Sequence, residues 1–348
     1  QWTLAGLLVV QILLLFMMHS SLAPASAAVA PHPFLPVLGS ITAVRLELDD
    51  ADGKNITLEH SGDEWILEEK DGYPVDGSKV DELLDSLKQA KVRRPVVTSN
   101  RYHDSLKVSE KTHEHRLKVW DSAENEKDDP KVDLFLGTSP NYRITHARLG
   151  GDNRVYEVAG LNSWQFRAEP GAWVKKKFVD VPADQVTGFR LENEHGTFEL
   201  QKKDGQWSLV SPKKKGKDLD SSKVEGLVSS FAALYLQDPV GKMDEEAQGL
   251  AKPAAIIRIT RTKPAPEETG DAGSTAAPDS EESAADAEGP EAPAAPEVET
   301  TTVRIGKISD EKAGTRFATR SGFDFAVTLG KYDAEKAVNQ NLEDLLNE

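Results

Sequence analysis

The chain has 348 residues and a formal net charge of −16 at pH 7, and 38% of its residues are hydrophobic. Its length exceeds that of one typical domain, so we expect two folded units. Eleven acidic residues between positions 264 and 303 carry most of the charge, and the mildly acidic remainder argues against a nucleic-acid partner. The absence of cysteine excludes disulfides, thiolate catalysis, Cys-ligated zinc and iron–sulfur clusters.

The N-terminal stretch is apolar. Residues 2–18 contain Gln11 as their one strongly polar member, a run that meets the lower length limit for crossing a ~30 Å hydrocarbon core. We therefore predict a transmembrane anchor or uncleaved signal at residues 1–21. The small residues Ala25-Ser26-Ala27 also fit a cleavage site, which leaves a cleaved leader as the alternative. No Lys or Arg precedes Arg45, so the flank after the apolar run lacks the charge of a cytoplasmic side.

Two stretches of the chain resemble each other, and we expect each to fold as one unit, at residues 41–181 and 182–348. In both, short runs of alternating apolar and polar residues surround a turn and a tryptophan, Trp65 or Trp207. This period-two pattern is typical of half-buried antiparallel strands. A Pro/Ala-rich spacer at residues 22–40 precedes the first unit.

The spacing of matched residues supports a duplication. The first strands align as Ile41–Glu47 with Val186–Glu192. The matched tryptophans lie 142 positions apart, whereas the matched glycines Gly137 and Gly306 lie 169 apart. An acidic insertion at residues 264–300 of the second unit explains the larger spacing. Its Pro, Ala, Glu and Asp composition predicts disorder.

One helix is predicted in each unit, because an apolar stripe at helical spacing follows the tryptophan in both. Asp76 and Asp220 precede these stripes and offer side-chain oxygens to cap the helices. The predicted fold class is therefore α+β: two tandem repeats of a mostly antiparallel β-sheet unit with one packed helix, preceded by an N-terminal transmembrane helix. The stripes consist of Val80, Leu83, Leu84 and Leu87 in the first unit and of Val224, Leu227, Val228 and Phe231 in the second.

One sequence pattern links the chain to a known family. It consists of Asp204-Gly205-Gln206-Trp207-Ser208-Leu209, then Asp220, then Lys223-Val224 and a leucine-spaced helix. With the connecting stretch Trp173–Val181, this pattern resembles the domain-of-unknown-function 4340 family. The resemblance implies a membrane-anchored protein that accompanies ABC transporter components of the gliding-motility type. It supplies no catalytic residues to carry over.

The histidines offer one candidate metal site. His113 and His115 lie two residues apart, so on a strand their rings would project from one face, where His146 could add a third ligand. The alternative is a pair of polar residues on a solvated face, which we prefer. We predict no metal site and no cofactor.

Other candidates are also explained more simply by structure. Adjacent carboxylates fall at expected turns, where acids are solvated, although a glycosidase-like pair needs only closeness in space. Trp65 and Trp207 occupy matched positions, which favours core packing over ligand stacking. The basic run Lys213–Lys217 fits a solvated turn, with anionic lipid or a partner as the alternative. The carboxylate pairs are Asp49-Asp50, Glu68-Glu69 and Asp128-Asp129, and the remaining candidate surface aromatics are Trp120, Trp164 and Trp173.

Taken together, these features predict no catalytic residues and a protein that is not an enzyme. We expect a membrane-anchored extracytoplasmic interaction module, accessory to an ABC-type membrane transport system. We place it in the inner (cytoplasmic) membrane as a single-pass protein, with its bulk in the periplasm or outside the cytoplasm and with a membrane-protein partner. The alternatives are a glycan- or polymer-binding protein, which would gather exposed aromatics beside a groove, and a hydrolase, which would gather carboxylates and histidines in a pocket.

Overall fold

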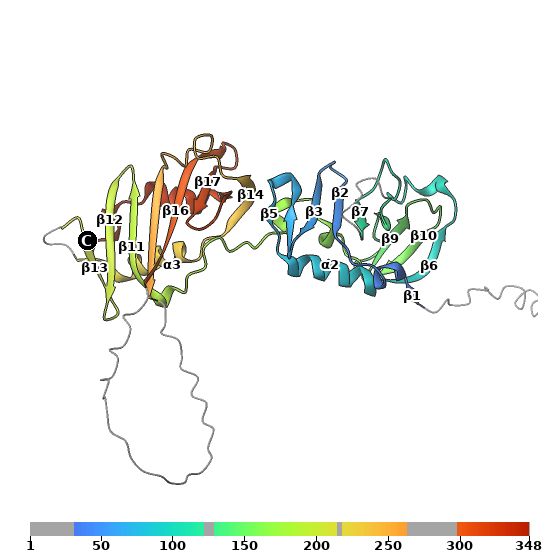
Figure 1. Ribbon diagram of the computed structural model, residues 1–348, viewed down its shortest axis with the longest axis horizontal. Coiled ribbons are helices and arrows are strands. Elements are labelled where there is room, and N and C mark those ends of the chain that lie inside the picture. Colours follow the sequence, from blue (N-terminus) through green and yellow to red (C-terminus); the bar gives the residue numbers. More distant parts are fainter. Residues whose placement is uncertain (1–30, 122–128, 214–217, 263–297, 348) are drawn as a thin grey trace, which may run out of the picture. The chain divides into compact units, whose positions relative to one another are not determined.

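The computed structural model describes residues 31–121, 129–213, 218–262 and 298–347 (Figure 1). The predicted transmembrane residues 1–21 lie outside this described part, as do residues 264–297 of the predicted insertion and Asp128 of one carboxylate pair. Among the helices of the described part, none is long and apolar enough to cross a membrane.

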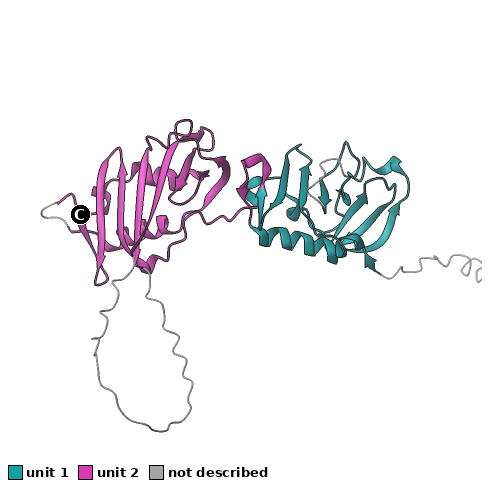
Figure 2. Cartoon of the chain, viewed as in Figure 1, with its two compact units in different colours: residues 1–66, 76–172 teal, residues 67–75, 173–348 magenta. Residues whose placement is uncertain are grey.

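The chain forms two compact units (Figure 2). Unit 1 comprises residues 1–66 and 76–172, and unit 2 comprises residues 67–75 and 173–348. Residues 67–75 join unit 2 because the buried ring of Tyr73 packs edge-on against two phenylalanine rings of that unit, with centroids 5.6 and 5.2 Å away.

The first sheet has ten strands in the order β1-β6-β10-β9-β8-β7-β2-β3-β4-β5, and unit 1 is built on it; only β5 lies wholly in the segment 67–75. Apolar and polar residues alternate along these strands, so that one set of side chains is buried and the other is not. The strands are β1 (His32–Pro33), β2 (Arg45–Asp50), β3 (Asn55–Ser61), β4 (Glu64–Leu67), β5 (Tyr73–Pro74), β6 (Lys91–Val97), β7 (His115–Trp120), β8 (Val132–Leu136), β9 (Ile144–Leu149) and β10 (Val155–Ala159).

Unit 2 is built on an eight-stranded sheet with the order β13-β12-β11-β15-β16-β17-β18-β14. The strands of the first sheet from β6 to β4 correspond one by one to the strands of unit 2 read from β14 to β13. In this correspondence β6 matches β14, β10 matches β18 and β2 matches β11. The strands are β11 (Val186–Asn193), β12 (Gly196–Lys203), β13 (Gln206–Ser211), β14 (Leu236–Lys242), β15 (Ala255–Thr262), β16 (Val298–Asp310), β17 (Thr315–Arg320) and β18 (Phe325–Leu329). Residues 298–300, which were assigned to the disordered insertion, begin β16.

Strand register shows that the sequence alignment of the first strands was two residues out. The alignment paired Leu46 with Leu191. In the sheets, however, Leu46 lies opposite Leu58, and Phe189 lies opposite Leu200. Leu58 and Leu200 lie 142 positions apart, the spacing of the matched tryptophans, so their partners Leu46 and Phe189 are equivalent. A shift of two residues keeps every side chain on its own face of the sheet, so the alternation of apolar residues could not reveal the error.

Three α-helices occur in the described residues: α2 (Gly77–Gln89), α3 (Ser221–Ala232) and α4 (Lys331–Asn339). The predicted stripes are buried, except that Leu84 is only half-buried. Asp220 caps α3 by accepting hydrogen bonds from two backbone amides, whereas the Asp76 side chain makes no such bond at α2.

The predicted α+β class with one packed helix per unit was wrong. The described chain is mostly antiparallel β structure with two sheets and three helices, and unit 2 carries two of those helices. Helix α4 went unpredicted because its buried side chains, Ala334, Ala337 and Val338, are small and form a weakly apolar stripe.

Candidate functional site

A hollow of about 380 Å³ opens in unit 1, where the end of β2 and the β2–β3 turn face the loop before β7. Its lining is rich in charge, which is unusual for a hollow that serves only packing. The ionisable residues of the lining are Asp49, Asp50, Lys54, Lys107, Lys111 and His113.

The β2–β3 turn forms one wall. One oxygen of the Asp50 carboxylate accepts hydrogen bonds from the backbone amides of Asp52 and Lys54, at 2.9 and 3.0 Å. The Lys54 ammonium donates to Glu169 at 3.1 Å, and this hydrogen bond raises the pKa of Lys54. The turn therefore places carboxylates and an ammonium group at fixed positions beside the hollow.

A tight hairpin forms the opposite wall. Val108 and His113 form an isolated β-bridge, and the backbone amide of Thr112 donates to the Ser109 hydroxyl at 2.9 Å. The Lys107 ammonium pairs with Glu114. Lys111 makes no ion pair or hydrogen bond to any residue that the structure describes. Of the three described lysines that line the hollow, Lys111 is therefore the one whose ammonium group is free to bind a ligand.

Lys107 adopts a backbone conformation that favours glycine. Its φ is +54°, and the equivalent residue of unit 2 is Gly249, with φ +71°. Lys107 follows Leu106, whose carbonyl oxygen lies against Gly137. In the same way, Gly249 follows Gln248, whose carbonyl oxygen lies against Gly306. A left-handed residue with a Cβ is destabilised by roughly 1–2 kcal/mol relative to the right-handed form. Unit 1 therefore places a lysine beside the hollow at a position where unit 2 has the less strained residue.

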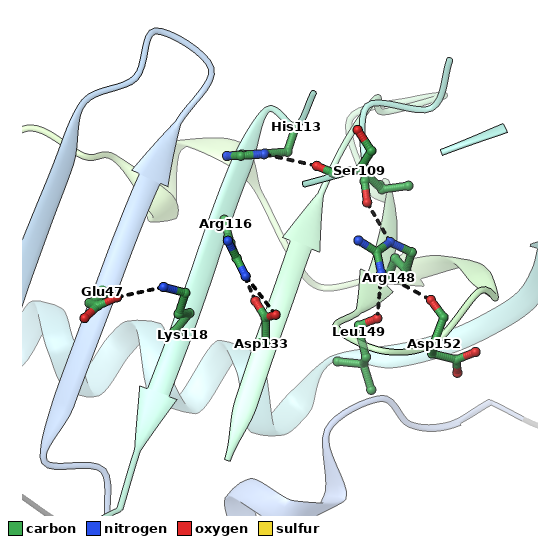
Figure 3. A network of polar contacts seen from close by, with 10 residues as sticks. Glu47, Ser109, His113, Arg116, Lys118, Asp133, Arg148, Leu149 and Asp152 are labelled. Atoms are coloured by element: carbon green, nitrogen blue, oxygen red, sulfur yellow. Dashed lines mark hydrogen bonds and ion pairs between the residues drawn. The ribbon is translucent and has the colours of Figure 1, made fainter. Parts of the chain in front are cut away.

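A polar network that includes Arg116 and Arg148 lies below this loop (Figure 3). Both arginines lie opposite Phe135 in the sheet. The guanidinium carbons of Arg116 and Arg148 lie 4.6 and 4.2 Å from the Phe135 ring centroid. Arg116 forms a two-pronged pair with Asp133 at 2.8 and 3.0 Å, and this contact raises the pKa of Arg116. These contacts hold the base of the loop in place.

Arg148 is buried and binds carbonyl oxygens instead of a carboxylate. Its Nε donates to Val108 O at 2.6 Å, and its Nη1 donates to Leu149 O at 3.1 Å and Asp152 O at 3.2 Å (Figure 3). Burial lowers the pKa of Arg148. The residue thus joins the loop before β7 to the turn after β9, and its role is structural.

The candidate histidine ligands do not come together. The His113 ring packs edge-on against Phe135, with centroids 5.7 Å apart. His115 lies opposite Leu136, on the other face of the sheet, and its ring lies 6.3 Å from that of Phe166. Residues on opposite faces cannot share one metal ion.

The other two candidate histidines are partly buried. Burial lowers the pKa of His115, and burial also lowers the pKa of His146, whose Nδ1 lies 2.9 Å from the Thr138 hydroxyl. Across the described ranges, no group of three or more His, Asp or Glu residues is placed to hold a metal.

The imidazole of the hollow makes a structural contact. His113 Nδ1 donates to the Ser109 carbonyl oxygen at 3.2 Å, within the hairpin that the Thr112 amide and the Ser109 hydroxyl also hold. Nucleophilic catalysis requires a base that contacts the nucleophile, and this nitrogen contacts a carbonyl oxygen instead.

The tryptophans in the described residues divide into three groups. Trp65 and Trp207 are both 8% exposed, so the predicted core packing is confirmed, and Trp173 is also buried. Trp120 is half-buried, whereas Trp164 is 58% exposed.

The acidic and basic candidates also have different environments. Asp49 and Asp50 line the hollow rather than standing at an isolated turn, and Glu68-Glu69 opens a short 3₁₀ segment. Of the basic run Lys213–Lys217, residues 214–217 lie outside the described residues. The sequence could not single out the hollow, because its two walls are far apart in the chain.

Comparison with protein-family models matches residues 65–253 to the family described as Domain of unknown function (DUF4340). This match covers more than half of the chain. The chain belongs to this family. No curated protein and no solved structure matches it. The matched range runs from Trp65 to the residues just before β15, so it includes the loop wall of the hollow and the whole of β13 in this DUF4340 protein.

Proposed function

We propose that this DUF4340 protein is a non-enzymatic interaction module that works outside the cytoplasm as an accessory to an ABC-type membrane transport system. The observation that carries the proposal is the charged hollow of unit 1, whose imidazole, on His113, is engaged in a hydrogen bond to a backbone carbonyl oxygen. Such a charged surface can bind a partner of complementary charge. The apolar run at residues 2–18 supports a location at the membrane.

We further propose that the two units are copies of one binding module. The shared strand order supports this, as do the matched glycines that lie against carbonyl oxygens in both units. In a duplicated module, the copies keep the residues needed for folding and diverge on the surface. The lysines at positions 107 and 111 and the longer loop around them are such a divergence.

Polymer binding ranks second. It would use exposed aromatic rings on one face, and Tyr142 and Trp164 are 79% and 58% exposed in unit 1. Tyr142, however, lies against the guanidinium of its neighbour Arg143, and no two exposed aromatics of the described chain are in ring contact. Nothing therefore groups them into a stacking platform.

The test is crosslinking in intact cells, followed by purification of a tagged full-length chain in detergent. We expect subunits of an ABC transporter to be recovered in stoichiometric amounts, and we expect Lys111→Glu to reduce that recovery. A matched control is Lys252→Glu, which changes a lysine in the corresponding loop of unit 2. Recovery of polysaccharide without transporter subunits would contradict the proposal, as would turnover of a substrate by the purified chain.

A further inference from the structure

The terminal strands of the two sheets differ in how well they are protected from pairing with another chain. Strand β1 covers the β6 edge in unit 1, with His32 opposite Val92 and Pro33 opposite Lys91. Strand β5 lies beyond β4 at the other end of that sheet. In unit 2, β14 carries Pro239 and two register shifts, both of which discourage further pairing. Strand β13 is the terminal strand at the remaining edge.

Strand β13 is less protected: it has one register shift against β12, between Leu209 and Ser211, and no described strand covers it. Its residues, Gln206–Ser211, include no charged side chain and no proline, and Val210 is 39% exposed. Exposed, uncharged edge strands present unpaired amide and carbonyl groups to any extended segment. No other described strand pairs with the outer side of β13.

The hairpin geometry identifies which backbone groups point outward. Lys203 lies opposite Gln206, and the two residues between them, Asp204 and Gly205, have φ of +52° and +80°. A two-residue turn of this kind makes the flanking residues a hydrogen-bonded pair, and bonding then alternates along the strand. The amide and carbonyl groups of Trp207 and Leu209 therefore face outward.

Charge around the edge selects the partner. Between positions 199 and 213 the chain has three lysines, at positions 202, 203 and 213, and two acids, Glu199 and Asp204. Glu199 lies opposite Ser211 but is paired with Arg190 at 3.5 Å. These lysines lie at both ends of β13. A second copy of β13 would bring its own lysines against them, whether it paired parallel or antiparallel. An extended segment with acidic flanks would instead meet complementary charge.

We propose that β13 binds an extended segment of a partner protein by strand addition, and that this segment carries acidic residues on either side of an uncharged stretch. Backbone hydrogen bonds to Trp207 and Leu209 provide the pairing, and the lysines select the acidic flanks. This inference deepens the proposed interaction function by naming the kind of partner and the surface it binds.

The test uses the full-length chain and a synthetic peptide of alternating threonine and valine residues with aspartate at each end. Binding is measured by fluorescence anisotropy at low salt, and amide hydrogen exchange locates the site. We expect exchange to slow at Trp207 and Leu209, with β14 unchanged. A lysine-flanked peptide should bind about tenfold or more weakly, and N-methylation of the peptide's pairing amides should abolish binding.

A charge exchange provides the matched variant. Lys213→Glu should weaken the aspartate-flanked peptide and strengthen the lysine-flanked one, whereas Lys242→Glu on β14 should change neither. The proposal is overturned if the N-methylated peptide binds as tightly as the unmodified peptide, or if hydrogen exchange slows at a strand other than β13. Both measurements use the unsubstituted protein, so they remain decisive even if the variants fail to fold. Concentration-dependent protection of β13 without peptide would also overturn the proposal, because that would assign the edge to a second copy. Loss of peptide binding with retained transporter recovery would remove this inference and leave the proposed function intact.

Discussion

At the scale of single residues, Lys107 and Gly249 form a natural comparison, because they occupy equivalent turns with φ of +54° and +71°. We predict opposite responses to substitution. Gly249→Ala should destabilise unit 2 by about 1–2 kcal/mol, since a left-handed alanine is strained and its Cβ would lie 3.0 Å from Lys307 N. Lys107→Gly should leave stability unchanged or raise it by up to about 1 kcal/mol, because the strain is relieved.

Urea denaturation of the two single variants checks this prediction. Equal destabilisation by both changes would contradict it. If Lys107→Gly folds stably but recovers less of the partner, the lysine serves binding and lowers the stability of the fold. Strained residues are often found at functional sites for this reason.

His115 is predicted to make stability depend on pH. Burial lowers its pKa in the folded protein, so the unfolded chain takes up a proton first as the pH falls. Stability is then fully present above the unfolded pKa of about 6.5 and is lost from there down to the folded pKa, with a slope of up to about 1.4 kcal/mol per pH unit. His115→Gln should flatten the curve of unfolding free energy below pH 6.5. An unchanged slope in the variant would count against this assignment.

At the scale of elements, a loop backbone lies close against the glycine that follows β8, Gly137, and against the equivalent glycine in β16, Gly306. A Cβ on Gly137 would lie 2.0 Å from Leu106 O, and one on Gly306 would lie 2.2 Å from Gln248 O. Because the blocking atom is backbone in both cases, we expect Gly137→Ala and Gly306→Ala each to destabilise the protein by about 3 kcal/mol or more.

The matched control is Gly226→Ala in α3, where an added Cβ meets nothing within 4 Å. That change should stabilise the protein by about 0.5–1 kcal/mol, because alanine favours the helix. Thermal unfolding of the three variants measures the difference. Tolerance of alanine at either sheet glycine would show that the loop can move away, and would weaken the equivalence of the two units.

At the scale of the whole molecule, the ends of the acidic stretch lie opposite each other. Thr262 and Val298 are Cα partners in the β15–β16 ladder. Replacing residues 263–297 with a short Asn-Gly turn should therefore preserve the fold. Loop-closure entropy falls with loop length, so stability should rise by about 1–2 kcal/mol. A Gly/Ser segment of the original length serves as the control. A drop of several degrees in melting temperature for the short-turn variant would show that the acidic stretch stabilises the fold.

The sequence by itself determined the local features of this protein. Alternation predicted strands, the leucine-spaced stripes predicted α2 and α3, and the spacing of Trp65 from Trp207 indicated two similar units. These patterns depend on residues close together in the chain, so one face of a strand or helix can be read directly.

Only the tertiary structure decided which distant residues meet. The hollow joins a β2–β3 turn to a loop more than fifty positions later, and the histidine pair is separated because its members pack on opposite faces of the sheet. The register of Leu46 against Phe189 and the uncovered edge at β13 were likewise undetermined by sequence. Period-two patterns are unchanged by a two-residue shift, and an edge is defined by which strand is absent beside it.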